Sequence, residues 1–404
     1  MSEIYKLDKG TLTYEIYDRT VDGKNEKYIV ITGGKDLGPC LILPDYINNI
    51  PVQIIGPQAF KFNEKIQSVK VPNTVTNICS DAFLKCENLE SVDFSKNLLH
   101  IEYCAFRGCS KLKEVDIPAS VFMIGESAFE DCISLEKVTF HEGLNVILES
   151  AFYNCILKNL ELPNSLTKIH KSAFERSGVQ TVVFGKELKE IHERVFYHCE
   201  QLVDVKFNEK LQSIDERAFS ECSSLKTFVL PDSLTRLGYE VVDNCVNLRH
   251  IHIGQKLSFP NTPITGDFAF GTSSLEKITV SPENKSLIVV DGILYDKEKK
   301  LLMKVCPHSP ITSVTIPEWT KCAFSLSFSE IETLKTITFK CSSIENINMS
   351  GVHTLEKTLV RCLPGSPLEK WCVKNELNVK SGSQLDNFLN KMINNEKTDK
   401  EATK

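Results

Sequence analysis

The sequence contains no long hydrophobic run and no large excess of charge of one sign. A transmembrane helix needs about 18 or more consecutive apolar residues. No stretch of the 404 residues reaches that length, so no membrane span is predicted. Lys and Arg number 47 and Asp and Glu number 53, which gives a formal net charge of −6. No basic stripe with interleaved aromatic residues offsets this balance, so nucleic acid is not expected as a partner.

Catalytic and targeting motifs are also missing. The chain has no G-x-S-x-G, H-E-x-x-H, Walker or dinucleotide-binding glycine pattern, so the sequence predicts neither an enzyme nor a bound cofactor. The first ten residues, MSEIYKLDKG, carry charges where a secretory signal needs an apolar core. That feature by itself predicts a cytoplasmic protein. The 15 cysteines are then expected to be reduced thiols.

One unit is repeated along most of the sequence. The pair Ala-Phe, or a close variant, returns every 22 or 23 residues, and the second residue of the pair is called the anchor below. Seven cysteines share the position three residues after the anchor, where Asn63 and Ser177 are the exceptions. The anchors are Phe60, Phe83, Phe106, Phe129, Phe152, Phe174, Phe196, Phe219 and Val242. The seven cysteines are Cys86, Cys109, Cys132, Cys155, Cys199, Cys222 and Cys245.

Each unit also carries a short strand pattern. Apolar residues stand six, nine and eleven positions after the anchor, as in Leu112, Val115 and Ile117, and Pro118 follows. A spacing of two with β-branched residues predicts a strand with one buried face. A coil of 23 residues has no second layer of its own, so it buries these side chains only against neighbouring coils. The sequence therefore predicts a β-rich solenoid.

The repeat resembles a known family. The pattern L-x-x-V-x-[FI]-P-x-x-L-x-x-I-x-x-x-A-F-x-x-C, complete from Leu112 to Cys132, looks like the BspA-like leucine-rich repeat of bacterial and protozoan surface proteins. Stretches from Gly10 to Asp18, Tyr28 to Gly33 and Leu41 to Pro44 resemble that family's N-terminal β cap. The resemblance implies a right-handed leucine-rich-repeat solenoid of the α/β type, with a helical cap at its C-terminal end. It also implies a cell-surface location, adhesion or host interaction, and a protein or glycan ligand.

The organisation along the chain follows from the pattern and the resemblance. We expect an N-terminal β cap over 1–56, regular coils over 57–281 and a hairpin insertion over 282–310. The two arms of this hairpin are expected at Ile288 to Tyr295 and Leu301 to Lys304. Degenerate coils over 311–362, a C-terminal cap over 363–382, and an amphipathic helix with a disordered tail over 383–404 complete the prediction.

The cysteine ladder admits a chemical and a structural interpretation. Neighbouring coils bring the Cα atoms of two ladder cysteines to a distance that a disulfide accepts. Side chains in register point the same way, however, which makes the required dihedral angle hard to reach. Zinc sites commonly use a C-x-x-C pair, which this chain lacks. We therefore interpret the seven cysteines as buried structural thiols that satisfy loop backbone groups.

One position of the repeat suggests a metal site. His170, His192 and Asp215 follow the repeat Ile in three consecutive coils. Two imidazoles and a carboxylate can form a facial triad around a metal ion with open positions, which would make a metal-dependent enzyme possible. The alternative is that this position, commonly Gly in the resembled family, here carries ordinary polar residues.

The strand pattern also selects candidate binding residues. Positions between the buried strand residues face outward and vary along the chain, whereas the buried set is constant. A partner with basic groups would complement an acidic cluster at one end, formed by Asp93, Glu114 and Asp116; the alternative is a solvated sheet face. The function predicted is a non-catalytic binding module, with an intracellular scaffold as the competing class. The candidate ligand-binding residues are Asp93, Glu114, Asp116, Lys137, Glu161, Asp204, Lys206, His250 and His252.

Overall fold

The computed structural model of the chain divides it into two compact units, Met1–Asn247 and Leu248–Lys404. Each unit is described by itself. The residues that the structure describes are 2–21, 23–259, 270–271, 274–298, 300–306, 308–320, 322–323, 331, 333–341, 357–374 and 376–380.

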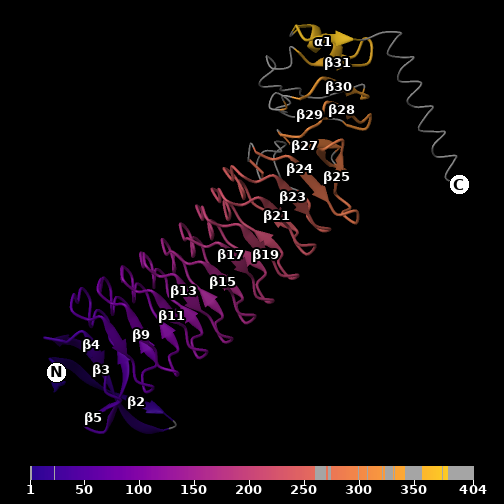
Figure 1. Ribbon diagram of the computed structural model, residues 1–404. Helices are drawn as coiled ribbons and strands as arrows, with labels where there is room; N and C mark the ends of the chain where they lie inside the picture. Colours follow the sequence, from indigo (N-terminus) through magenta and orange to yellow (C-terminus); the bar gives the residue numbers. More distant parts are fainter. Residues whose placement is uncertain are drawn as a thin grey trace. The chain divides into compact units, whose positions relative to one another are not determined.

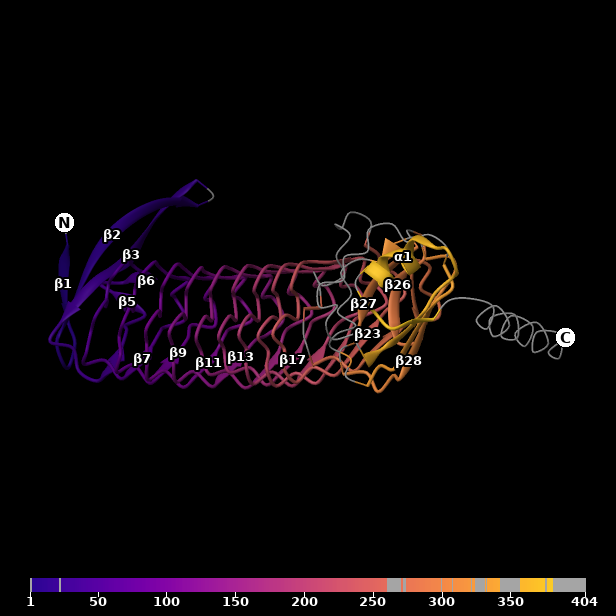
Figure 2. The same ribbon diagram turned by 90° about the horizontal axis from the view of Figure 1, so that it is seen from above.

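The first unit begins with a meander of three antiparallel strands. Strands β1 and β2 pair, and β2 forms a long hairpin with β3 that bulges between Thr13 and Tyr14. Ile29 to Ile31 of β3 then pair in parallel with β6, which joins this cap to the coils. Beyond the residues that pair with β6, the hairpin projects from the solenoid (Figure 2), and its residues Tyr17 to Thr20 and Gly23 to Lys27 are exposed. The strands are β1 Glu3–Lys6, β2 Thr11–Val21, β3 Lys24–Lys35, β5 Tyr46–Ile47 and β6 Ile50–Ile55.

Each following coil contributes one strand to the front and one to the back of a solenoid. The front strands follow one another along the first unit (Figure 1), and β6 with the hairpin lies on the opposite side (Figure 2). We call the outward side of the front strands the front face, and the sheet that contains β8 to β22 the back sheet. The front strands are β4 Cys40–Ile42, β7 Ser68–Lys70, β9 Ser91–Asp93, β11 Glu114–Asp116, β13 Lys137–Thr139, β15 Asn159–Glu161, β17 Thr181–Val183, β19 Asp204–Lys206 and β21 Thr227–Val229.

The back sheet is built from two-residue strands in strict register. Ile101 of β10 pairs with Ile78 of β8 and with Ile124 of β12, and the same parallel register continues coil by coil. Its strands are β8 Asn77–Ile78, β10 His100–Ile101, β12 Met123–Ile124, β14 Val146–Ile147, β16 Lys168–Ile169, β18 Glu190–Ile191, β20 Ser213–Ile214 and β22 Arg236–Leu237. The repeat Ile positions therefore stack on one another inside the solenoid.

A third hydrogen-bonded ladder runs through the anchors. The amides of Asp81, Phe83 and Lys85 donate to carbonyls of Tyr103, Ala105 and Arg107 in the next coil, at 2.9, 2.8 and 2.7 Å. Asp81 and Lys85 have φ values of 59° and 54°, so the backbone alternates with left-handed residues instead of forming a regular strand. The pattern recurs in later coils, for example at Ser127 and Asp131.

Aromatic stacking fills the core of the first unit. The Phe106 and Phe129 rings lie parallel with centroids 5.3 Å apart, and Phe129 stacks on Phe152 at the same distance. All three are 0% exposed. Each ring is covered by the rings of the two adjacent coils. A single coil could therefore not bury its ring alone. The predicted leucine-rich-repeat solenoid is confirmed.

The second unit continues with parallel pairs and one meander. β23 pairs with β24, and β28, β30, β31 and β32 form one parallel sheet. The first predicted hairpin arm, Ile288 to Tyr295, is wrong: it is two strands, β25 and β26, which turn at Asp291 and Gly292 with φ values of 48° and 75°. The strands are β23 His250–Ile253, β24 Lys277–Val280, β25 Leu287–Val290, β26 Ile293–Asp296, β27 Leu301–Val305, β28 Ser313–Ile316, β29 Cys322–Ala323, β30 Thr336–Phe339, β31 Leu359–Arg361 and β32 Val379–Lys380.

A short helix, α1 Pro367–Lys374, lies near the end of the described chain. It buries Leu368 and Cys372 in the core of the second unit. Among the described residues, no helix is both long enough and apolar enough to cross a membrane. The amphipathic helix predicted over 383–404 lies outside the described residues.

Candidate functional site

The front face presents the candidate ligand-binding residues of the first unit to solvent. In β11, Val115 is 3% exposed while Glu114 and Asp116 point outward on either side of it. The same alternation exposes Asp93, Lys137, Glu161, Asp204 and Lys206. His250 and His252 belong to the second unit. The Nε2 atom of His250 and the Nδ1 atom of His252 each lie 2.9 Å from the Oγ1 atom of Thr279.

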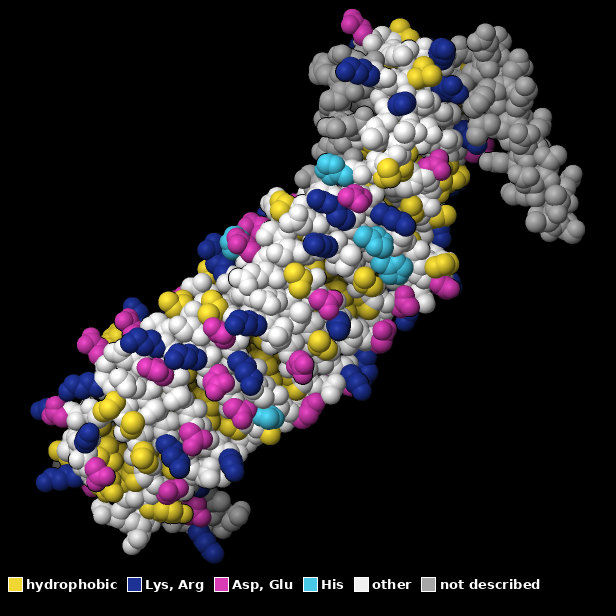
Figure 3. All heavy atoms as spheres, viewed as in Figure 1, with side chains coloured by type: hydrophobic (Ala, Val, Ile, Leu, Met, Phe, Trp, Pro, Cys, Tyr) yellow, Lys and Arg dark blue, Asp and Glu magenta, His cyan; other side chains and the backbone are white. Residues whose placement is uncertain are grey.

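The acidic cluster predicted on the front face is partly compensated by neighbours. Glu114 lies beside Lys137 in the parallel register of β11 and β13. The Asp116 Oδ1 atom is 2.7 Å from the Nε2 atom of His141. Acidic and basic side chains are interspersed over this side of the coils (Figure 3). The front face is therefore a mixed-charge surface that is able to form specific ion pairs, without a wide field of one sign.

A shallow depression interrupts the front face between β13 and β15. The coil that starts at Phe152 has 22 residues, since Leu157 comes two residues after Cys155 rather than three. The hydrogen-bonded front sheet is interrupted between β13 and β15, as it also is between β9 and β11 and between β19 and β21. A depression of about 610 Å³ opens there, lined by Lys137, Thr139, Lys158 and Glu161 among others. The Lys158 ammonium bridges to Glu136 at 2.6 Å across the break.

The cysteine ladder makes a repeated contact with the backbone. Each ladder Sγ lies 3.1 to 3.3 Å from the carbonyl oxygen of the anchor Phe in the preceding coil. Ser177 is too short for this reach, and its Oγ donates instead to Phe174 in its own coil at 2.6 Å. Burial raises the pKa of the Cys86 thiol to about 12. The fourteen cysteines whose side chains the structure describes are free thiols.

The structure does not bring His170, His192 and Asp215 together as a metal site. The rings of His170 and His192 have centroids 5.8 Å apart, and His192 Nδ1 lies 3.2 Å from Asp215 Oδ2. The other oxygen of Asp215 pairs with Arg236 at 2.8 Å. Burial, with Lys168 and His192 nearby, lowers the pKa of His170. Over the described residues, no group of three or more His, Cys, Asp or Glu side chains is arranged to hold a metal ion.

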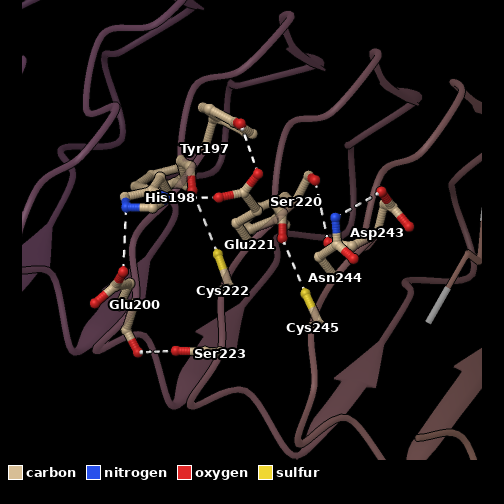
Figure 4. Close-up of polar contacts among 12 residues, drawn as sticks. Tyr197, His198, Glu200, Ser220, Glu221, Cys222, Ser223, Asp243, Asn244 and Cys245 are labelled. Atoms are coloured by element: carbon tan, nitrogen blue, oxygen red, sulfur yellow. Dashed lines mark hydrogen bonds and ion pairs between the residues drawn. The ribbon is translucent and has the colours of Figure 1, made fainter. Parts of the chain in front are cut away.

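A network along the turns of the third ladder was missed by the sequence analysis (Figure 4). Tyr197 donates its hydroxyl to Glu221 at 2.7 Å, and His198 Nδ1 lies 2.6 Å from the other Glu221 oxygen. His198 Nε2 lies 3.1 Å from Glu200. The hydrogen bonds from Tyr197 and His198 lower the pKa of Glu221. The bond between Tyr197 and Glu221 in turn raises the pKa of Tyr197. A scan for polar pairs separated by 23 or 24 residues, one coil, would have found this network.

Comparisons with known proteins agree with this architecture. The profile of the BspA type leucine rich repeat region matches residues 53–180, 146–262 and 172–289, in six copies. A leucine-rich repeat protein from Bacteroides ovatus has a similar solved structure, with a TM-score of 0.63 at 20% identity over 94% of this chain and 100% of that one. Comparison with curated proteins finds no match.

Two further solved structures are similar over smaller parts of the chain. The T. pallidum leucine rich repeat protein has 25% identity and a TM-score of 0.41 over 52% of this chain and 87% of that one. A leucine rich cell surface protein from Faecalibacterium prausnitzii has 19% identity and a TM-score of 0.34 over 69% and 95%. Because the matching profile covers more than half of the sequence, the chain belongs to the BspA-type leucine-rich repeat family.

Proposed function

We propose that the protein is a non-catalytic binding module that holds a protein ligand on the front face of its first unit. The observation that carries this proposal is the alternation of the front strands. In each coil the central residue of the front strand is buried and apolar, and the residue on either side of it points outward. The buried residue keeps its character along the unit, whereas the outward residues differ from coil to coil. A rigid frame with variable, solvent-facing side chains is suited to recognition because little conformational entropy is lost on binding.

The chemistry of the front face favours a protein over a glycan. Its outward positions from Ser68 to Val229 carry charged, hydroxyl, amide and small apolar side chains and no aromatic ring on which a sugar could stack. Neighbouring charges of opposite sign, such as Glu114 and Lys137, give a pattern that a protein surface can complement. The depression beside Lys158 and Glu161 offers a place for a projecting side chain.

Capture of partners from the source cells tests the front face. The variant Asp93→Lys, Glu114→Lys, Asp116→Lys is compared with wild type and with Glu64→Lys, Glu87→Lys, Glu209→Lys. The second variant changes the net charge equally at exposed positions off the front strands. We expect only the first variant to lose its partner, by at least about tenfold in affinity if one central contact is broken. Equal recovery of the partner by both variants would contradict a ligand site on the front face. Binding to a glycan array without a protein partner would show that the ligand is a glycan.

We also propose a location on the cell surface, which the resemblance to bacterial and protozoan surface proteins supports. An intracellular scaffold is the competing class. Protease added to whole cells digests a surface protein and spares an intracellular one, so immunoblotting after mild proteolysis separates the two. Full protection in intact cells, with digestion after lysis, would overturn the surface location.

A further inference from the structure

An exposed apolar strip lies on the back sheet, away from the front face. Leu99 and Phe122 are 43% and 53% exposed. They lie side by side in neighbouring coils, since the amide of Phe122 donates to the carbonyl of Leu99 at 3.2 Å. Beside them, the outward residues of β10, β12 and β14 are His100, Met123 and Val146, which are in register and half-buried. Large apolar side chains gathered on one exposed surface mark interaction sites more often than scattered ones.

A row of acidic side chains borders this strip. Tyr103, Glu126 and Glu149 occupy equivalent positions in three successive coils, where the amides of Cys104 and Ser127 donate to the carbonyls of Glu126 and Glu149 at 3.0 and 2.9 Å. Tyr103 is 47% exposed and both glutamates are exposed. Within the described residues, neither glutamate forms an ion pair or a side-chain hydrogen bond. Like charges on adjacent rungs disfavour folding, so this row is better accommodated when a cation from outside lies on it.

The charge within the back-sheet segments has one sign, and the nearby Arg107 pairs with Glu130. The four back-sheet segments 76–80, 99–103, 122–126 and 145–149 contain three glutamates and no Lys or Arg. Lys168 and Lys171 in the next coil mark where the acidic region ends. The strip and the acidic row are four residues apart in the chain, on either side of the two-residue strands β10 and β12, and four residues span at most about 14 Å. We call Leu99, Phe122, Met123, Val146, Tyr103, Glu126 and Glu149 the back-sheet patch.

We propose that the back-sheet patch is the docking site of a cationic amphipathic helix from a partner protein. An α-helix is about 10–12 Å wide, so one helix is able to contact both rows. Its apolar stripe covers Leu99 and Phe122, while Lys or Arg side chains on its flank pair with Glu126 and Glu149. Tyr103 adds a ring of the kind enriched at binding hot spots. A second copy of this chain is a poorer occupant, because the same patch offers no Lys or Arg to pair with Glu126 and Glu149. This site is independent of the proposed front-face ligand.

A designed helix tests the patch on the full chain. The probe is a fluorescent peptide of about 18 residues, five helical turns, with Leu at helical spacing and Lys elsewhere. A peptide of the same composition with the Leu residues dispersed is its control. Anisotropy titrations compare wild type with Phe122→Ala and with the double variant Glu126→Lys, Glu149→Lys. The control is the double variant Glu64→Lys, Glu87→Lys, which changes the charge equally at exposed positions off the front strands and off the patch. All four substituted glutamate side chains and Phe122 are exposed, so folding should be preserved, which circular dichroism checks.

The proposal makes distinct expectations for each variant. The back-sheet double variant weakens binding at least about tenfold, the loss of a strong contact. Phe122→Ala weakens it several-fold, and the control double variant Glu64→Lys, Glu87→Lys leaves it within a factor of about two. Equal weakening by both double variants would show attraction to net charge alone and would overturn the proposal. Equal affinity for the dispersed peptide, or no binding of the designed helix, would overturn it as well.

Discussion

Cysteine suits its position in the repeat because its side chain is apolar and also carries a weak donor. The thiol of Cys132 is 0% exposed, yet its sulfur lies 3.2 Å from the carbonyl of Phe106 in the preceding coil. Where another residue stands at this position its polar group bonds within its own coil: Asn63 Oδ1 accepts from the Lys65 and Ile66 amides, and the Ser177 hydroxyl donates to Phe174. Desolvation raises the pKa of the Cys132 thiol, so this thiol stays protonated and unreactive at neutral pH. The ladder is therefore a structural element of the repeat.

Glu221 offers a test of the turn network at the residue scale. Its pKa is lowered by Tyr197 and His198, relative to an unfolded value of about 4.3. A lowered folded-state pKa stabilises the fold above the unfolded pKa, and this contribution is lost as the pH falls through the folded-state pKa. We expect Glu221→Gln to lower the free energy of unfolding by less than about 1 kcal/mol at pH 7, as a largely solvent-screened contact does.

Urea unfolding of wild type and Glu221→Gln between pH 7 and pH 3 measures this effect. The difference between the two proteins should shrink toward zero in the acidic range. Glu87→Gln, which changes an exposed glutamate in another coil, is the matched control and should show no such trend. A difference that is independent of pH would contradict the role of the ionised carboxylate.

At the scale of the element, each coil is closed by residues in the left-handed region of φ. The two left-handed positions flank the anchor, as Asp81 and Lys85 flank Phe83. A residue other than glycine pays about 1–2 kcal/mol in this conformation. The inter-coil hydrogen bonds that these amides donate offset that cost. Gly108, with a φ of 71°, occupies one of these positions without the steric cost.

Lys85→Val tests the left-handed turn. A β-branched side chain is strained at a φ of 54°. Lys85 already bears the general cost of this conformation, so we expect the added strain of the β-branched side chain to lower the free energy of unfolding by about 1 kcal/mol. Glu87→Val, two residues further along in the same coil and also exposed, is the control and should change stability by less than about 0.5 kcal/mol. Equal losses in urea unfolding of the two variants would show that the cost comes from valine on the surface and not from the turn.

The first unit as a whole is quasi-one-dimensional, because each coil packs on its two neighbours. Phe129 stacks on Phe106 and Phe152 alone among the described anchor rings. The hydrogen bonds of the back sheet likewise join only adjacent coils. Stability in such an architecture is approximately a sum of coil and nearest-neighbour terms. A local defect should therefore have a local effect.

Hydrogen exchange on Phe129→Ala tests this property. Removing a fully buried ring costs about 3–5 kcal/mol. We expect faster exchange at the amides of Phe106, Phe129 and Phe152, with an effect that declines toward Phe219. Phe122→Ala, at an exposed position of the same coil, should leave the pattern unchanged. Uniform acceleration over the whole first unit would indicate a single cooperative unit instead.

Much of the architecture was predictable because the repeat is visible in the sequence. Anchors, buried strand residues and cysteines recur at fixed intervals, so their stacking follows once the coils are in register. The two strands β25 and β26 were predicted as one arm, since a run from Ile288 to Tyr295 does not reveal that Asp291 and Gly292 turn back. Over the described residues His170, His192 and Asp215 are not arranged to hold a metal ion, and Arg236 in a fourth coil pairs with the carboxylate, which the spacing did not reveal.

The sequence by itself determined the period, the buried rows and the family, since these depend on local spacing that repeats along the chain. Only the tertiary structure decided which polar side chains meet. Tyr197 and Glu221 are 24 residues apart and become neighbours only because coils stack, and Glu126 and Glu149 form a row for the same reason. Lateral contacts depend on the side chains of adjacent coils together with their rotamers. A spacing rule places each residue on a face and leaves its partner undetermined.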